Sequence, residues 1–125
     1  MEIAFLLTYL KSINNIYKQG ILMYQIIKKI VRPNESVEFP FLPDIADPAH
    51  LEHLSVNYEQ SSKNILRDTA QGDNSLERIV TMLWDSKASY DEYEADPVIT
   101  EMKINFLQVI SDRGMTLETI SQTEW

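Results

Sequence analysis

The sequence contains no cysteine and only three glycines. The lack of cysteine excludes disulfides, thiolate metal sites and thiol nucleophiles, and it favours a reducing, cytoplasmic location. Three glycines leave little material for a glycine-rich phosphate loop, and no phosphate-loop, Ser-His-Asp or EF-hand spacing occurs. We therefore expect no cofactor.

Basic side chains and long hydrophobic runs are also scarce. The net charge is −8, from 11 basic and 19 acidic residues, so phosphate is repelled and nucleic acid is not expected as a partner. The most apolar stretch, residues 1–10, is too short to cross a bilayer. It also carries Glu2 where a secretory signal has positive charge, so we expect neither a signal peptide nor a membrane partner.

Two interpretations of residues 1–22 remain open. Their apolar residues have the spacing of an amphipathic helix that ends at Gly20. Alternatively, Met23 directly precedes a good strand, so residues 1–22 could be an upstream extension and the native chain could start at Met23. Both interpretations give one folded domain over residues 23–125, a normal size for a single core.

The rest of the chain predicts four strands and two main helices. The segments with strand patterns are residues 24–32, 64–69, 76–85 and 116–122. Start signals at Asp47, Ser86 and Asp96 predict a helix over residues 48–61 and a second helix from residue 87 that restarts at Pro97. Gly114 should end it.

Residues 33–48 hold four of the five prolines and should form an extended loop pinned by aromatic side chains. The resulting order, β-α-β-β-α-β, predicts an α+β, ferredoxin-like fold with a four-stranded antiparallel sheet and its helices on one face.

The strands at residues 24–32 and 76–85 carry apolar side chains on both sides. If four of these side chains stayed in water on the face without helices, about 1.5–3 kcal/mol would be lost for each. A second copy of the chain, packed sheet on sheet, would cover this face. We therefore expect a homodimer.

The stretch from Ile79 to Ile99, reading IVTMLWDSKASYDEYEADPVI, resembles a strand-helix signature of the dimeric α+β barrel superfamily. The resemblance is strongest to the antibiotic-biosynthesis-monooxygenase-like (ABM-like) domains. It rests on the Trp84-Asp85-Ser86 corner, on the tyrosines of the following helix and on Asp96-Pro97 at its break. It extends more loosely over residues 23–122. It implies a ferredoxin-like dimeric barrel, in a superfamily that includes cofactor-independent oxygenases, haem-degrading enzymes and members with no known activity.

The resemblance does not extend to the catalytic residues. Members that oxidise quinol-type substrates often carry a histidine on the helix after the Trp-x-Ser corner, where this chain has Tyr93. The haem-degrading branch uses a histidine further along that helix and an asparagine on the first strand. Here those places hold Met102 and Gln25, so no haem ligand is implied.

One group of residues is a candidate ligand site. These side chains could line a pocket between sheet and helices that suits a small apolar or aromatic molecule, or they could simply fill the core. They are Tyr24, Met82, Trp84, Tyr90 and Tyr93.

Two other clusters favour structural interpretations. His50 and His53 share a helical face, but the further ligands that zinc needs are not specified, so no metal site is predicted. The acidic residues between Asp85 and Asp96 are typical of a solvated helix face.

Two functional hypotheses follow. The first is a non-catalytic, dimerising domain for binding or assembly, of a small acidic kind that is frequent in phages and viruses. The second is a cofactor-independent, monooxygenase-like enzyme acting on a small aromatic or quinol-type substrate. The missing histidine favours the first, but the sequence does not decide whether the chain is an enzyme.

Overall fold

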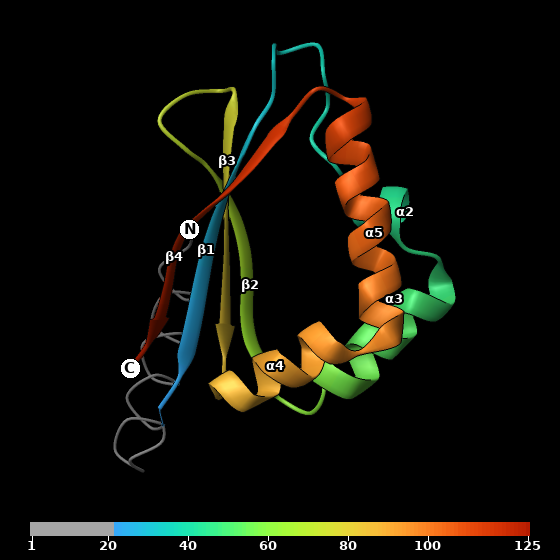
Figure 1. Cartoon of the computed structure of the whole chain (residues 1–125), viewed down its shortest axis with the longest axis vertical. Coiled ribbons are helices and arrows are strands. Elements are labelled where there is room, and N and C mark those ends of the chain that lie inside the picture. Colours follow the sequence, from blue (N-terminus) through green and yellow to red (C-terminus); the bar gives the residue numbers. More distant parts are fainter. Residues whose placement is uncertain (1–21) are drawn as a thin grey trace.

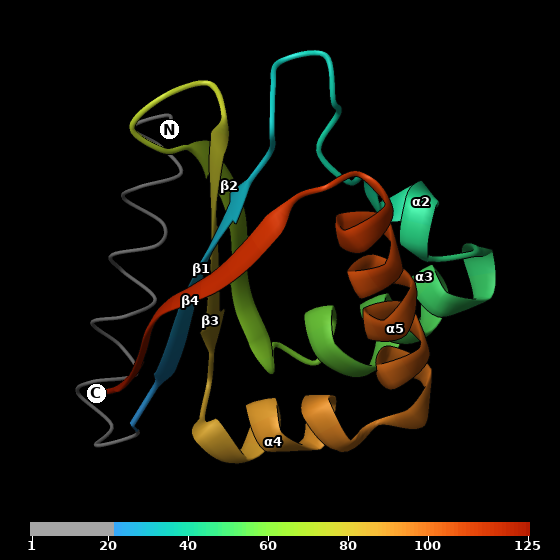
Figure 2. The same ribbon diagram turned by 45° about the horizontal axis from the view of Figure 1, so that its top comes forward.

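The computed structural model describes residues 22–125 and shows a sheet with helices packed on one side (Figure 1, Figure 2). The strands are β1 (Tyr24–Val31), β2 (Asn64–Gln71), β3 (Glu77–Trp84) and β4 (Thr116–Glu124). The helical elements are α2 (Leu42–Ile45), α3 (Pro48–Leu54), the π-helical turn η1 (Ser55–Glu59), α4 (Lys87–Ala95) and α5 (Pro97–Asp112). The helix expected before Gly20 lies outside the described residues.

The sheet has the order β2-β3-β1-β4, and every neighbouring pair is antiparallel. The order and the one-sided helices confirm the ferredoxin-like α+β fold. Met23 and Trp125 exchange two backbone hydrogen bonds, with N–O distances of 2.6 and 2.9 Å, which extends the pairing of β1 with β4 to the last residue.

The helix boundaries follow the caps that the sequence predicts. Ser86 Oγ accepts a hydrogen bond from Ser89 N at 3.1 Å, and Asp47 Oδ1 accepts one from His50 N at 2.8 Å. Asp96 Oδ1 caps α5 through Val98 N at 2.9 Å. After α5, Gly114 has φ +65°, a left-handed conformation that glycine adopts without steric cost.

Two segments differ from the sequence-based expectation. The proline-rich stretch contains the short helix α2, because Pro43 lies in its first turn, where a missing N–H costs nothing, and Asp44 Oδ2 accepts a bond from Phe41 N at 2.9 Å. The helix expected to run from Pro48 to Ser61 changes at Ser55 to the wider η1 turn and ends at Glu59.

The two faces of the sheet have different cores. On the helix side, Trp84 is fully buried among aromatic and aliphatic side chains, and a second cluster surrounds Phe39. On the other face, Met23, Leu66 and Leu83 form a smaller cluster. In residues 22–125, no helix is both long and apolar enough to cross a membrane.

Candidate functional site

A cavity of about 440 Å³ lies between the helix-side face of the sheet and helices α2 and α5. This volume falls in the range of small-molecule sites in proteins, about 300–1,000 Å³. Side chains from all four strands contribute to its floor: Lys28, Ile30, Arg67, Thr69, Arg78, Val80, Met82 and Leu117.

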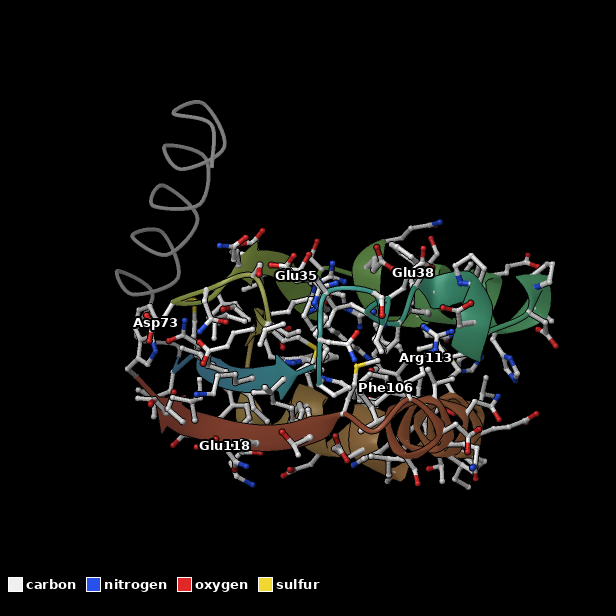
Figure 3. The ribbon with its side chains drawn as sticks, turned by 90° about the horizontal axis from the view of Figure 1, so that it is seen from above. Glu35, Glu38, Asp73, Phe106, Arg113 and Glu118 are labelled. Atoms are coloured by element: carbon white, nitrogen blue, oxygen red, sulfur yellow. The ribbon has the colours of Figure 1, made fainter. Side chains whose placement is uncertain are left out.

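The opposite wall of the cavity is mostly apolar. It is formed by Leu42 and Ile45 of α2 and by Met102, Phe106 and Leu107 of α5. In the view from above, Phe106 points from α5 toward the interior (Figure 3). Both helices therefore present a hydrophobic surface to the cavity.

The loop that precedes α2 is tied to the end of α5. Arg113, at the C-terminal cap of α5, donates a 3.0 Å hydrogen bond from Nη1 to the backbone oxygen of Glu38, and it lies near this loop in Figure 3. Its Nη2 lies 3.4 Å from Asp44 Oδ2 in α2. These contacts hold the apolar wall in place over the sheet.

Strand register brings three cations to the floor, and we call Lys28, Arg67 and Arg78 the cationic floor. Lys28 of β1 is opposite Val80 of β3, and Arg78 of β3 is opposite Ile30. Arg67 of β2 is opposite Met82. Successive residues of a strand point to opposite faces, so all three side chains share the helix-side face.

The Arg67 guanidinium lacks partners for two of its nitrogens. Its Nε and Nη2 atoms are buried and make no hydrogen bond among the described residues. A buried donor without a partner loses its hydrogen bonds to water and gains none in the protein. The resulting free-energy cost is larger for a charged group. This is an unusual state for an arginine in a folded protein.

Lys28 and Arg78 are also in unfavourable surroundings. Burial lowers the pKa of Lys28, and the nearby charge of Lys103 lowers it further, against an opposing effect of Glu94. Burial likewise lowers the pKa of Arg78, with a smaller contribution from Arg32. The Arg78 guanidinium carbon lies 4.4 Å from the centre of the Phe39 ring, and this cation–π contact offsets part of the cost of burying the charge.

Glu94 is the single carboxylate among the described residues that line the cavity, and it already has a cationic partner. Lys103 Nζ lies 2.7 Å from Glu94 Oε2. Burial alone would raise the pKa of the Glu94 carboxyl, but contacts with Lys103 and Tyr90 and the charge of Lys28 outweigh burial and lower it. Glu94 is therefore ionised near neutral pH.

The five candidate residues from the sequence lie in two places. Met82 and Tyr93 line the cavity. Tyr24, Trp84 and Tyr90 are buried in the neighbouring aromatic cluster, where the Trp84 ring centre lies 4.7 Å from that of Tyr93 and 5.7 Å from that of Tyr90. Tyr93 thus connects this cluster to the cavity.

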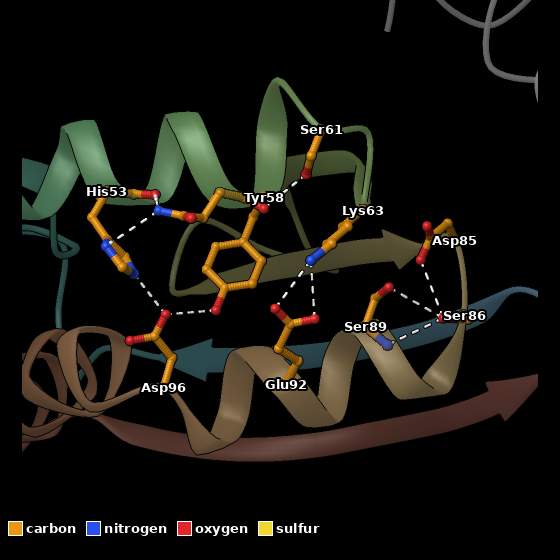
Figure 4. Close-up of polar contacts among 10 residues, drawn as sticks. His53, Tyr58, Ser61, Lys63, Asp85, Ser86, Ser89, Glu92 and Asp96 are labelled. Carbon is orange, nitrogen blue, oxygen red and sulfur yellow. Dashed lines mark hydrogen bonds and ion pairs between the residues drawn. The ribbon is translucent and has the colours of Figure 1, made fainter.

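A polar network lies beside the aromatic cluster (Figure 4). Asp96 Oδ2 lies 2.6 Å from His53 Nε2 and accepts a 2.6 Å hydrogen bond from the Tyr58 hydroxyl. Neither His53 nor His50 lines the cavity. His50 contacts Asp47 and Glu101, and within residues 22–125 no group of three or more potential ligands is arranged to hold a metal ion.

The acidic residues of α4 are engaged in ion pairs. Lys87 Nζ lies 3.1 Å from Asp91 Oδ2. Lys63 Nζ lies 3.0 Å from Glu92 Oε1, a pair that Figure 4 shows. Both pairs are largely exposed and contribute little to stability. Asp91 and Glu92 thus lie on a solvated helix face, as the sequence predicts, whereas Glu94 lines the cavity and the Asp96 side chain is only 13% exposed.

Sequence reasoning missed the cationic floor. Lys28 lies between Ile26 and Ile30 on one side of β1, and Arg78 continues the row of Val80 and Met82 on β3. A cation at a core-facing position of an apolar strand was the available signal. Arg67 gave no such signal, because a register shift between Asn64 and Leu66 breaks the alternation on β2.

Searches for related proteins give likeness in structure and none in sequence. No protein-family model matches the chain, and no curated protein matches it. Among solved structures, a variant of SnoaB, a cofactor-independent oxygenase from Streptomyces nogalater, has a TM-score of 0.50 with 5% identity, over 82% of this chain and 90% of that chain.

Two further structures are similar at lower scores. A dimeric ferredoxin-like protein from an uncultured marine organism has a TM-score of 0.49 with 11% identity, over 84% of both chains. A putative antibiotic biosynthesis monooxygenase from Chloroflexus aurantiacus has a TM-score of 0.43 with 15% identity, over 82% of this chain and 90% of that one. At these identities the likeness concerns the fold alone. The likeness to the SnoaB variant, together with the strand order, supports the ferredoxin-like fold.

Proposed function

We propose that this protein is a non-catalytic, dimerising α+β-barrel domain that binds a small molecule in the cavity between its sheet and its helices. The cavity itself is the observation that carries the proposal. Its volume of about 440 Å³ and its apolar helical wall suit a small, partly hydrophobic ligand.

The side chains around the cavity favour binding over catalysis. A general base needs a pKa near the working pH, whereas the pKa of Glu94 is lowered and its carboxylate is paired with Lys103. Both histidines lie outside the cavity lining. The described lining therefore offers neither a histidine nor an unpaired carboxylate as a general base.

The second face of the sheet supports dimerisation. Ile27 and Ile79 are only half-buried there, and the described helices all lie on the other face (Figure 2). Packing this face against the same face of a second copy would remove both side chains from water.

A neutral fluorescent probe tests the binding proposal. Phenylnaphthylamine becomes bright in apolar surroundings, and the protein should bind it. Val80→Phe, which adds volume on the cavity floor, should weaken binding, whereas Ile79→Phe, on the opposite face of the same strand, should not. Absence of binding, or equal weakening by both variants, would refute a ligand site in the cavity.

A second candidate is a cofactor-independent oxygenase. It is favoured by the contact between Tyr93 on the cavity wall and Trp84 behind it, whose Nε1 is buried without a hydrogen-bond partner among the described residues. Such a wall suits a planar, quinol-type substrate. Oxygen uptake with a quinol, abolished in Tyr93→Leu, would replace the non-catalytic proposal with this one.

A further inference from the structure

We propose that the natural ligand is an amphipathic anion, with an acidic oxygen group held by the cationic floor and an apolar body against α2 and α5. The inference rests on the proposed binding function and specifies the chemistry of the ligand. The chain is strongly acidic, yet its cavity is lined by four basic side chains and one acidic one. The cavity lining thus has a net positive charge in a protein whose net charge is negative, and the overall composition does not explain this local difference.

The internal ion pairs leave an excess of positive charge in the cavity. Lys103 and Glu94 neutralise each other across 2.7 Å. The three cations of the floor make no ion pair among the described residues, and two Arg67 nitrogens are buried without any partner. A buried charged donor is normally paired or hydrogen-bonded, and an anion in the cavity would supply the partner that the two Arg67 nitrogens lack.

The geometry of the sheet fits one acidic group. Lys28, Val80 and Thr69 form a row across β1, β3 and β2, because Val80 is opposite both Lys28 and Thr69. Arg67 and Arg78 lie one inward-facing position away from this row, on either side of it. Lys28 is thus directly opposite Val80, Arg67 is its diagonal neighbour at about 7–8 Å, and Arg78 is the preceding inward-facing residue of β3. Long side chains from these three positions can reach an acidic group held above Val80.

The types of donor favour an oxyanion over a halide or a polar neutral group. Guanidinium groups present planar N–H pairs that match the oxygens of a carboxylate, sulfonate or phosphate. Thr69 also lines the floor, and its hydroxyl is a further hydrogen-bond donor. The opposite wall has hydrophobic side chains from both helices, so the rest of the ligand should be apolar.

A matched pair of probes tests the charge separately from the cavity. Anilinonaphthalene sulfonate and phenylnaphthylamine share their aromatic skeleton and differ in the sulfonate. Fluorescence titration of the full chain should give tighter binding of the sulfonate. This preference should decrease as salt rises, because mobile ions screen the attraction.

Variants on the two faces of the sheet identify the responsible charges. Arg67→Gln should weaken sulfonate binding about tenfold or more, because a hydrogen bond to a charged group is lost. It should leave binding of the neutral probe nearly unchanged. Lys28→Gln should act in the same direction and provides a second test if the first variant fails to fold. Lys29→Gln is the matched control, because Lys29 is the next residue of β1, points to the other face and contacts Glu77 at 3.7 Å.

Each outcome has a definite meaning. Loss of the sulfonate preference in Arg67→Gln and Lys28→Gln, but not in Lys29→Gln, would support the anion site. Equal affinity for the two probes, or a preference that neither floor variant changes, would overturn the anion inference and leave the neutral ligand cavity standing. If neither probe binds, both this inference and the proposed function are wrong.

Discussion

At the scale of single residues, Arg67 differs most from what folding alone would favour. Two buried guanidinium nitrogens without hydrogen-bond partners among the described residues destabilise the folded chain, and a hydrophobic side chain of similar length would remove this cost. Residues that lower stability often serve function, because binding sites are assembled at the expense of stability. We therefore expect Arg67 to lower the stability of the ligand-free protein and to contribute to ligand binding.

Arg67→Met should stabilise the ligand-free protein. We expect the free energy of unfolding to rise by about 1–3 kcal/mol, the usual cost of an unsatisfied buried donor, as measured by urea denaturation. Arg78→Met is the matched control. It removes a guanidinium that already contacts the Phe39 ring, at 4.4 Å, so this variant should not raise the free energy of unfolding. A loss of stability in Arg67→Met would show that its guanidinium is satisfied.

Trp84 tests the aromatic cluster. Its exposure is 0%, so Trp84→Ala should lower the free energy of unfolding by about 3–5 kcal/mol. Trp84→Phe keeps most of the packing and should lower it by less. An unchanged denaturation curve in Trp84→Ala would remove this residue from the core.

At the scale of elements, Asp96 joins three of them. It caps α5 through Val98 N, lies against His53 of α3 and accepts a hydrogen bond from Tyr58 of η1. Burial alone would raise the pKa of this carboxyl, but these three contacts outweigh burial and lower it. The ionised form is therefore the one that stabilises the fold.

Asp96→Ala should lower the free energy of unfolding by about 1–3 kcal/mol near neutral pH, because a helix cap and a part-buried hydrogen bond are lost together. Asp96→Asn keeps the cap and should lower it by less.

The pH dependence follows from the lowered pKa. The stability that the Asp96 carboxylate contributes is fully present above its unfolded pKa, about 3.9, and is lost as pH falls through the lower folded value. The difference in the free energy of unfolding between the native protein and Asp96→Ala should therefore become smaller over that acidic range. A constant gap would contradict the charged role of Asp96.

Local signals predicted most elements, and the exceptions have physical causes. Ser86 and Asp96 are caps whose effect depends only on nearby backbone, so both helix starts were predictable. The short α2 was not, because four prolines suggested an extended chain although Pro43 lies in the one turn that tolerates it.

The floor of the cavity was harder to predict. Alternation places Lys28 and Arg78 among apolar neighbours of β1 and β3. Both strands are apolar on each side, however, so alternation alone did not show that the helices cover the face of these two cations. The bulge before Leu66 hid the orientation of Arg67. Such facts depend on tertiary packing, which a single sequence specifies only indirectly.

At the scale of the whole molecule, the two faces of the sheet have separate roles in this account. The helix-side face holds the cavity, and the other face, with Ile27 and Ile79, is the proposed dimer interface. Changes on one face should therefore leave the function of the other intact.

Light scattering should give a mass of about twice the 14.5 kDa of one chain. Ile79→Glu should produce a monomer by placing a charge in the interface. Ile104→Glu, at an α5 position that is 62% exposed, should remain a dimer.

A chain lacking residues 1–22 should also remain a folded dimer if residues 23–125 form the domain, as we propose. A monomeric native protein would contradict the proposed interface.

The most direct measurement is an NMR titration of methyl-labelled methionines with phenylnaphthylamine and its sulfonated relative. Met82 and Met102 line the cavity, whereas Met23 lies on the other face and Met115 in the Phe39 cluster. Both probes should shift the Met82 and Met102 signals and leave the Met23 signal in place. A shift of Met23 alone would place the ligand on the opposite face and contradict a binding site between the sheet and the helices.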